Sequence, residues 1–169
     1  ATKGLTVTES VGLLKTEHWM LLRLHDVLMF RLAAEPVYEL KTAYSLHAHI
    51  AAEWISWIQT RIREMREPPY GLDRAPNSLI DVIFDEIKYS EGTEAMVLGL
   101  YDKAFPALEA IARQHLDETN ALFDHPTHRL LKLMLVELEE INAYGQRVVE
   151  CLVDHQVRSQ HAKWLSDLD

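Results

Sequence analysis

Cysteine is almost absent from this chain of 169 residues, which carries a single one, Cys151. One cysteine excludes an internal disulfide framework. Cys151 follows Val148 and Val149 and precedes Leu152, so we expect a small buried hydrophobic side chain and not a nucleophile. Glycine and proline are also scarce, with six of each, and no segment is low in complexity. Disorder is therefore expected only near the two ends.

Long apolar runs are missing as well. No stretch approaches the roughly 18 apolar residues of a membrane-spanning helix, and no signal peptide is recognisable, so a cytoplasmic location is expected. Basic residues are too few to balance the acidic ones, with 17 Lys and Arg against 26 Asp and Glu and a net charge of -9. Such a charge repels polyanions, which makes nucleic acid and anionic membrane surfaces poor partners.

Helical periodicity, by contrast, is abundant. Apolar residues recur every three to four positions in four long segments, which cover about residues 8–33, 38–66, 93–120 and 124–164. Pro36 marks a tight turn after the first segment, Pro68 and Pro69 stop the second, and Pro106 predicts a bend in the third. No β pattern competes with the helical one. The sequence therefore predicts a single all-α domain over residues 1–169.

The connection between the second and third segments is long, at about residues 67–93. It contains a short amphipathic piece at about residues 78–89, whose Ser78 and Asp81 resemble a capping box. Tight turns make neighbouring helices antiparallel, and one long crossover lets the second hairpin lie against the first. We therefore expect two antiparallel helix pairs joined by a long crossover that contains a short helix.

Four glutamates are predicted to lie at matching heights in this arrangement. Glu17 and Glu53 are equally far from residue 35, and Glu109 and Glu137 are equally far from residue 123. Since these two positions lie in the tight turns, each hairpin is expected to place one glutamate opposite another on its core side. Buried carboxylates are costly and repel each other, so a convergent set favours a cation between them.

The helix order, the crossover and the four glutamates resemble the ferritin-like superfamily of four-helix bundles. Its dinuclear members carry Glu on the first and third helices and Glu-x-x-His on the second and fourth. The corresponding stretches here are Glu17, Glu53-Trp54-Ile55-Ser56, Glu109 and Glu137-Leu138-Glu139-Glu140. Ser56 and Glu140 thus stand where the superfamily has histidine.

This resemblance implies an oxidoreductase with two iron or two manganese ions, which would activate dioxygen or a peroxide towards an unknown small-molecule substrate. It implies that the metal ligands are Glu17, Glu53, Glu109 and Glu137. Glu140 and His49, one turn before Glu53, are candidates for the remaining ligands. Tyr144, one turn beyond Glu140, is the candidate redox-active tyrosine.

The same residues allow a metal-free interpretation. Glutamates inside a bundle are also satisfied by basic partners, for which the candidates are Arg23, Arg31, Arg61, Arg129 and the histidines. The alternative function is therefore a helical bundle that binds a small molecule or a partner protein, because one fold serves many functions. Association into a homo-oligomer is compatible with both interpretations. Iron storage is less favoured because it requires assembly of a cage.

Overall fold

The computed structural model describes residues 4–169, which are helical and contain no β-strand. This confirms the all-α prediction. Three long helices are α1 (Val7–Leu32), α2 (Tyr38–Glu64) and α6 (His125–Leu152). A further rod consists of three consecutive pieces, α4 (Gly92–Val97), the π-helix η1 (Leu98–Ala104) and α5 (Phe105–Glu118). The short helices are α3 (Ser78–Lys88), α7 (His155–Gln160) and α8 (Ala162–Asp167). No helix in residues 4–169 is long and apolar enough to cross a membrane.

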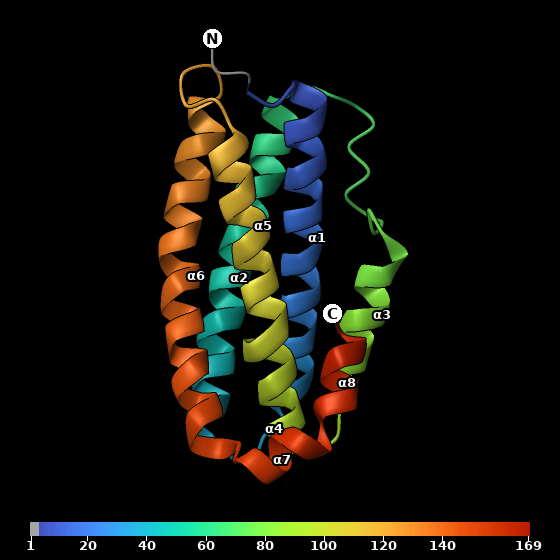
Figure 1. Cartoon of the computed structure of the whole chain (residues 1–169). Coiled ribbons are helices and arrows are strands. Elements are labelled where there is room, and N and C mark those ends of the chain that lie inside the picture. The colour runs from blue at the N-terminus through green and yellow to red at the C-terminus, as the bar shows by residue number, and fades with distance from the viewer. Residues whose placement is uncertain (1–3) are drawn as a thin grey trace.

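The long rods lie side by side and run alternately up and down around the bundle (Figure 1). α1 packs on α2 and α5, and α6 packs on α5 and α2, so each rod has two long neighbours. The chain leaves α2 at one end, returns along the outside of α1 through α3, and enters α4 at the other end (Figure 1). The seam between α2 and α6 therefore joins the two helix pairs on the side away from this crossover.

The helix starts follow from local capping. Thr6 caps α1 in a reciprocal box with Glu9, as its hydroxyl accepts from the Glu9 amide and its own amide donates to the Glu9 carboxylate. Asp124 caps α6 by accepting from the Thr127 amide. The predicted cap of α3 is one residue off, because Asn77 is the cap and Ser78 is the first helical residue.

The expected bend at Pro106 takes the form of a π-helical stretch immediately before it. Proline has no amide proton to donate to the carbonyl of Asp102, and its ring crowds that carbonyl. The backbone widens instead, and the Phe105 amide donates to the Leu100 carbonyl five residues back. Tyr101 lies within this π-helical stretch and is buried in the bundle interior.

The fourth predicted segment is too long, since α6 ends at Leu152 and not near residue 164. Val153 is extended, and Asp154 then caps a separate helix by accepting from the Val157 amide. The apolar residues beyond this break, Leu165 and Leu168, are buried in the C-terminal segment, where α8 packs on η1. The prediction that Cys151 is buried is also wrong, because its side chain is exposed.

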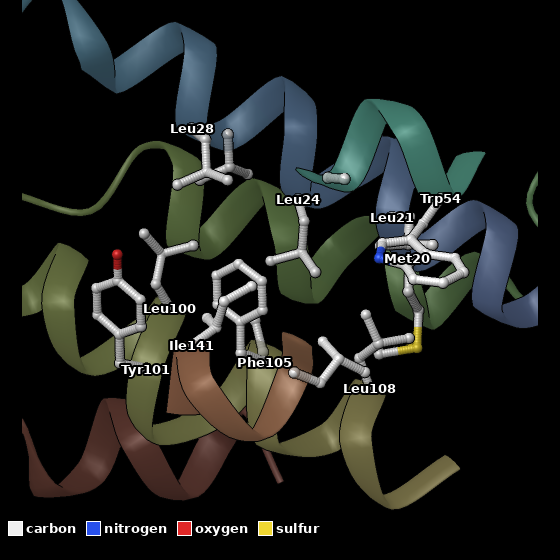
Figure 2. Close-up of a cluster of buried hydrophobic side chains, with 14 of the residues drawn as sticks. Met20, Leu21, Leu24, Leu28, Trp54, Leu100, Tyr101, Phe105, Leu108 and Ile141 are labelled. Atoms are coloured by element: carbon white, nitrogen blue, oxygen red, sulfur yellow. The ribbon is translucent and has the colours of Figure 1, made fainter. Parts of the chain in front are cut away.

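The core consists of aliphatic and aromatic side chains from every long rod (Figure 2). α1 contributes a row of leucines, α2 contributes Trp54, and the third rod contributes Tyr101 and Phe105, whose rings are stacked with centroids 5.7 Å apart. α6 approaches this pair closely at Gly145. A Cβ added to Gly145 would lie 2.5 Å from the Tyr101 Cβ, so only glycine permits this approach.

We therefore predict that Gly145→Ala lowers the free energy of unfolding by about 1–3 kcal/mol, because the added methyl must push α6 away from Tyr101. Urea denaturation measures the change. Gly12→Ala is the matched control. It adds the same group in α1 where nothing lies within 4 Å, and we expect it to stabilise the protein by up to about 1 kcal/mol. Equal effects of the two variants would contradict this account of the packing.

Candidate functional site

The first predicted glutamate pair does not form. Glu17 is fully buried, whereas the side chain of Glu53 is 64% exposed. The sequence correctly groups His49, Glu53 and Trp57 on one face of α2, but that face points to solvent. The side chain of His49 is 69% exposed and lies 3.7 Å from the Glu53 carboxylate. The buried face of α2 carries Ala51 and Ile58 instead.

The second glutamate pair lies on facing helices, but each member has its own partners. Glu109 accepts hydrogen bonds from Arg113 and from the Asn142 amide. Glu137 accepts a hydrogen bond from the Trp54 indole. These donors neutralise or solvate each carboxylate separately, so no cation is needed to keep the two apart.

The donors do not fit a dinuclear metal centre. Among residues 4–169, no group of three or more His, Cys, Asp and Glu side chains is placed to hold a metal ion. The prediction of one buried cluster of four glutamates is therefore wrong. The two supplementary candidates do not repair it, because His49 and Glu140 are exposed. Tyr144 is half-buried and lines a groove between α2 and α6.

Glu17 is held by a buried histidine, which agrees with the metal-free interpretation in which a histidine satisfies a buried glutamate. Its Oε1 lies 2.9 Å from Nδ1 of His115, a residue of α5 that is also fully buried. Nε2 of His115 lies 3.2 Å from the hydroxyl of Ser10, which in turn donates to the Asp124 carboxylate at 3.3 Å. The sequence indicates the burial of His115 through its spacing, because it follows Ala112 by three residues and Leu108 by seven on the buried side of α5.

The protons of this network can be assigned by elimination. The single hydroxyl proton of Ser10 goes to Asp124, so Nε2 of His115 must donate to Ser10. Nδ1 of His115 and the Glu17 carboxylate then share one proton, which makes the pair neutral overall. Burial raises the pKa of Glu17, against the opposing effect of its hydrogen bond to His115.

The network continues towards the surface at the end of the bundle where α1 begins and where the turn between α5 and α6 lies. Although burial alone would raise the pKa of Asp124, its hydrogen bonds with Thr127 and Arg61 hold that pKa below the ordinary value. Arg61 of α2 donates to Asp124 and to the Thr127 hydroxyl, both at 2.8 Å. Ser10 is buried and gives its proton to a carboxylate, so the Ser–His–Glu order here is a structural clamp and not a nucleophilic site.

The best candidate site is a groove of about 340 Å³ in the α2–α6 seam. Its walls are apolar, with Ala43, Leu46 and Ile50 from α2 and Ile141 and Tyr144 from α6. Its polar lining residues are Glu39, Thr42, His47, Glu137 and Glu140. A small hollow beneath it is also lined by His47, Ile50, Glu137 and Ile141, and it reaches Trp54 and Phe105 in the core.

His47 forms the floor of this groove and is a functional candidate that the sequence-based prediction missed. Its Nδ1 lies 2.9 Å from the Tyr101 hydroxyl, and its ring meets the edges of Tyr101, Phe105 and Tyr144 at centroid distances of 5.4–5.7 Å. Desolvation by burial lowers the pKa of His47 to about 4, so the imidazole is neutral near pH 7. Its Nε2 has no hydrogen-bond partner among the described residues.

Two positions from the sequence-based site, Glu137 and Glu140, line this groove together with Tyr144. Burial raises the pKa of Tyr144, so its hydroxyl stays protonated. The signal for His47 was present, because it lies three residues after Tyr44 and four before Ala51 on the buried stripe of α2. What the sequence does not reveal is that Tyr101, 54 residues away, binds the imidazole.

No protein-family model matches the chain, and neither a curated protein nor a solved structure is significantly similar to it. The function is therefore inferred from the geometry of the groove.

The neutral state of His47 predicts a pH-dependent stability. Its pKa falls from 6.5 in the unfolded chain to about 4 in the folded protein, so the unfolded chain takes up the proton first as the pH falls. The part of the free energy of unfolding that is linked to His47 is fully present above pH 6.5. It is lost as the pH falls from 6.5 to 4, by up to about 3 kcal/mol. Denaturation of His47→Gln should show this loss removed, whereas exposed His49→Gln should keep it. A pH dependence that is unchanged in His47→Gln would refute the assignment.

Proposed function

We propose that the protein binds a small organic amine with an apolar body in the α2–α6 groove. The observation that carries this proposal is the composition of the groove. Three carboxylates, Glu39, Glu137 and Glu140, surround an apolar pocket with a neutral imidazole at its floor, and no Lys or Arg lines it. A volume of about 340 Å³ lies at the lower end of the roughly 300–1,000 Å³ of ligand pockets, which favours a small molecule.

The lining matches the two ends of such a ligand. An ammonium group has three N–H donors and a positive charge, which suit carboxylate acceptors and the face of an aromatic ring such as Tyr144. An alkyl or aryl body is suited to the walls formed by Leu46 and Ile141. Nε2 of His47 offers one hydrogen bond to a polar atom of the body. The Trp54 indole holds the Glu137 carboxylate in place.

The chemistry of the lining favours binding over turnover. A general base works best when its pKa is near the operating pH, and the pKa of His47 is about 4. The lining contains one hydroxyl group besides Tyr144, that of Thr42, and no base is bonded to it. Thr42 donates its proton to the Tyr38 carbonyl, so it is not activated as a nucleophile.

The ferritin-like di-metal oxidoreductase stays a prediction of the sequence resemblance. The order of the long rods and the crossover through α3 support the ferritin-like architecture (Figure 1). The metal chemistry has no comparable support, because the expected ligands are dispersed. We infer that, if the ancestry is ferritin-like, this chain has the fold without the dinuclear ligand set.

A metal titration separates the two functions. We expect the melting temperature to stay constant when Fe(II), added without oxygen, or Mn(II) is titrated into the protein, because a ligand stabilises only if the folded state has a site for it. A rise in melting temperature that Glu53→Ala abolishes and Glu91→Ala does not would contradict this expectation and support the oxidoreductase.

Phenethylamine is a suitable probe for the groove, and calorimetry measures its binding. We expect the double variant Glu39→Gln/Glu140→Gln to bind the amine about tenfold more weakly. The loss is modest because water screens the attraction between each exposed carboxylate and the ammonium group. The control Glu86→Gln/Glu150→Gln removes the same charge from exposed positions outside the groove. Ala43→Phe, which fills the groove, should abolish binding. Equal binding by wild type and Ala43→Phe would rule the groove out.

A further inference from the structure

The outer surface of the α2–α6 seam carries an exposed apolar stripe. Leu46 is 55% exposed, Trp57 48%, Leu133 39% and Val136 56%. We call this stripe, with the charged residues at its two ends, the seam face. Half-exposed tryptophan is unusual on a surface that meets only water, and tryptophan is enriched at the centres of protein interfaces.

The two ends of the seam face differ in charge. At one end lies the groove with its carboxylates, including Glu140. At the other end is a second hollow of about 560 Å³, also between α2 and α6, lined by Trp57, Arg61 and Arg129 among others. Arg61 is balanced by Asp124 and Glu64. Arg129 has no ion pair or hydrogen bond among residues 4–169, so it is an uncompensated positive charge.

We propose that the seam face binds a second copy of this chain in an antiparallel, two-fold symmetric dimer. The two-fold axis lies in the interface and crosses α2 and α6 at right angles. Such an axis places each end of one seam face on the opposite end of the other. The acidic end of each copy therefore meets Arg129 of the other copy, twice in each dimer, as a closed two-fold interface requires.

The residue spacing on α6 fits this axis. Antiparallel copies of one helix pair residues that are equally far from the axis. If the axis crosses α6 midway between residues 134 and 135, Arg129 of one copy lies opposite Glu140 of the other. Leu133 of one copy then lies opposite Val136 of the other. Arg129 and Glu140 are 11 residues apart, or about 16 Å along the helix, so each charged pair lies about 8 Å from the axis.

The spacing on α2 fits the same axis. If the axis crosses α2 midway between residues 51 and 52, Trp57 of one copy lies opposite Leu46 of the other. The levels on the two helices coincide, because the groove joins the start of α2 to the middle of α6, and the second hollow joins the end of α2 to the start of α6. One axis thus places the Arg129–Glu140 pairs outside the exposed apolar side chains. The exposed His49 and Glu53, which share the face of Trp57 on α2, lie closer to the axis than these pairs.

The proposed dimer does not require the proposed amine binding, although both involve the Glu140 carboxylate. An ammonium ligand and Arg129 of the second copy compete for the same carboxylate. Saturating amine is therefore expected to weaken the dimer, and by linkage the dimer weakens amine binding by the same factor. Failure of amine binding leaves the interface untouched, because its charges and apolar stripe are present without ligand.

A charge-swap experiment, read by sedimentation velocity over a concentration series, tests the interface. We expect wild type to be dimeric at about 100 μM. Arg129→Glu and Glu140→Arg should each raise the dimer dissociation constant at least about tenfold, since each places two like-charged pairs in the dimer. Trp57→Ala should weaken the dimer similarly. The control Glu150→Arg makes the same charge change on α6 outside the seam face and should have no effect.

Two restorations make the test specific. An equimolar mixture of Arg129→Glu and Glu140→Arg pairs opposite charges at both contacts, so it should form a heterodimer. The double variant Arg129→Glu/Glu140→Arg should regain the homodimer for the same reason. A wild type that is monomeric at about 100 μM would overturn the proposal. A dimer that neither single change weakens, or that neither restoration recovers, would equally overturn it.

Discussion

The close approach of α6 to Tyr101 at Gly145 is the contact on which the rest of the interior depends. Tyr101 is buried within the π-helical stretch before Pro106, and the missing side chain at Gly145 leaves room for its ring. The Tyr101 hydroxyl forms a hydrogen bond with His47 of α2. This bond satisfies one nitrogen of the buried imidazole among apolar side chains. The third rod, α2 and α6 are thereby positioned around one buried tyrosine, and the groove opens directly above it.

Two buried histidines show how the same side chain serves different purposes. His115 shares a proton with Glu17 and continues through Ser10 to Asp124, so all of its polar atoms are used inside the bundle. His47 uses one nitrogen on Tyr101 and leaves the other towards a groove. His115 uses both ring nitrogens in a clamp inside the bundle, in which Oε2 of Glu17 has no hydrogen-bond partner among residues 4–169. The second nitrogen of His47 supplies a polar contact for a ligand. Because Glu17, Glu109 and Glu137 each have a separate partner, the electrostatic reason for a metal cluster is also removed.

The seam between α2 and α6 carries two hollows, of about 340 and 560 Å³. Side chains that could have closed it, such as Leu46 and Trp57, stay partly in water. A small amine in the groove and a second copy on the seam face are two ways to cover that surface. Both proposals use Glu140, so we expect the amine and the second copy to compete, and an amine to weaken the proposed dimer.

The sequence by itself determined the helices, the turn at Pro36, the stop at Pro68 and Pro69, and the long connection with its short helix. These features depend on local periodicity, on proline and on capping, which act within a few residues. It also grouped His49, Glu53 and Trp57 on one face of α2 correctly. The prediction that this face points inward was wrong, because the apolar Trp57 beside Glu53 made an exposed face look like part of the core.

Only the tertiary structure decided which polar residues meet. Glu17 pairs with His115 and His47 with Tyr101, at separations of 98 and 54 residues. Each pairing depends on the rotation of two rods about their axes, and a one-residue turn of about 100° would replace every partner. The equal-distance rule for hairpins supplies height along the bundle but not this rotation. The π-helical stretch and the break after Leu152 add rotations that no helical repeat contains, because backbone sterics and packing against distant segments set them.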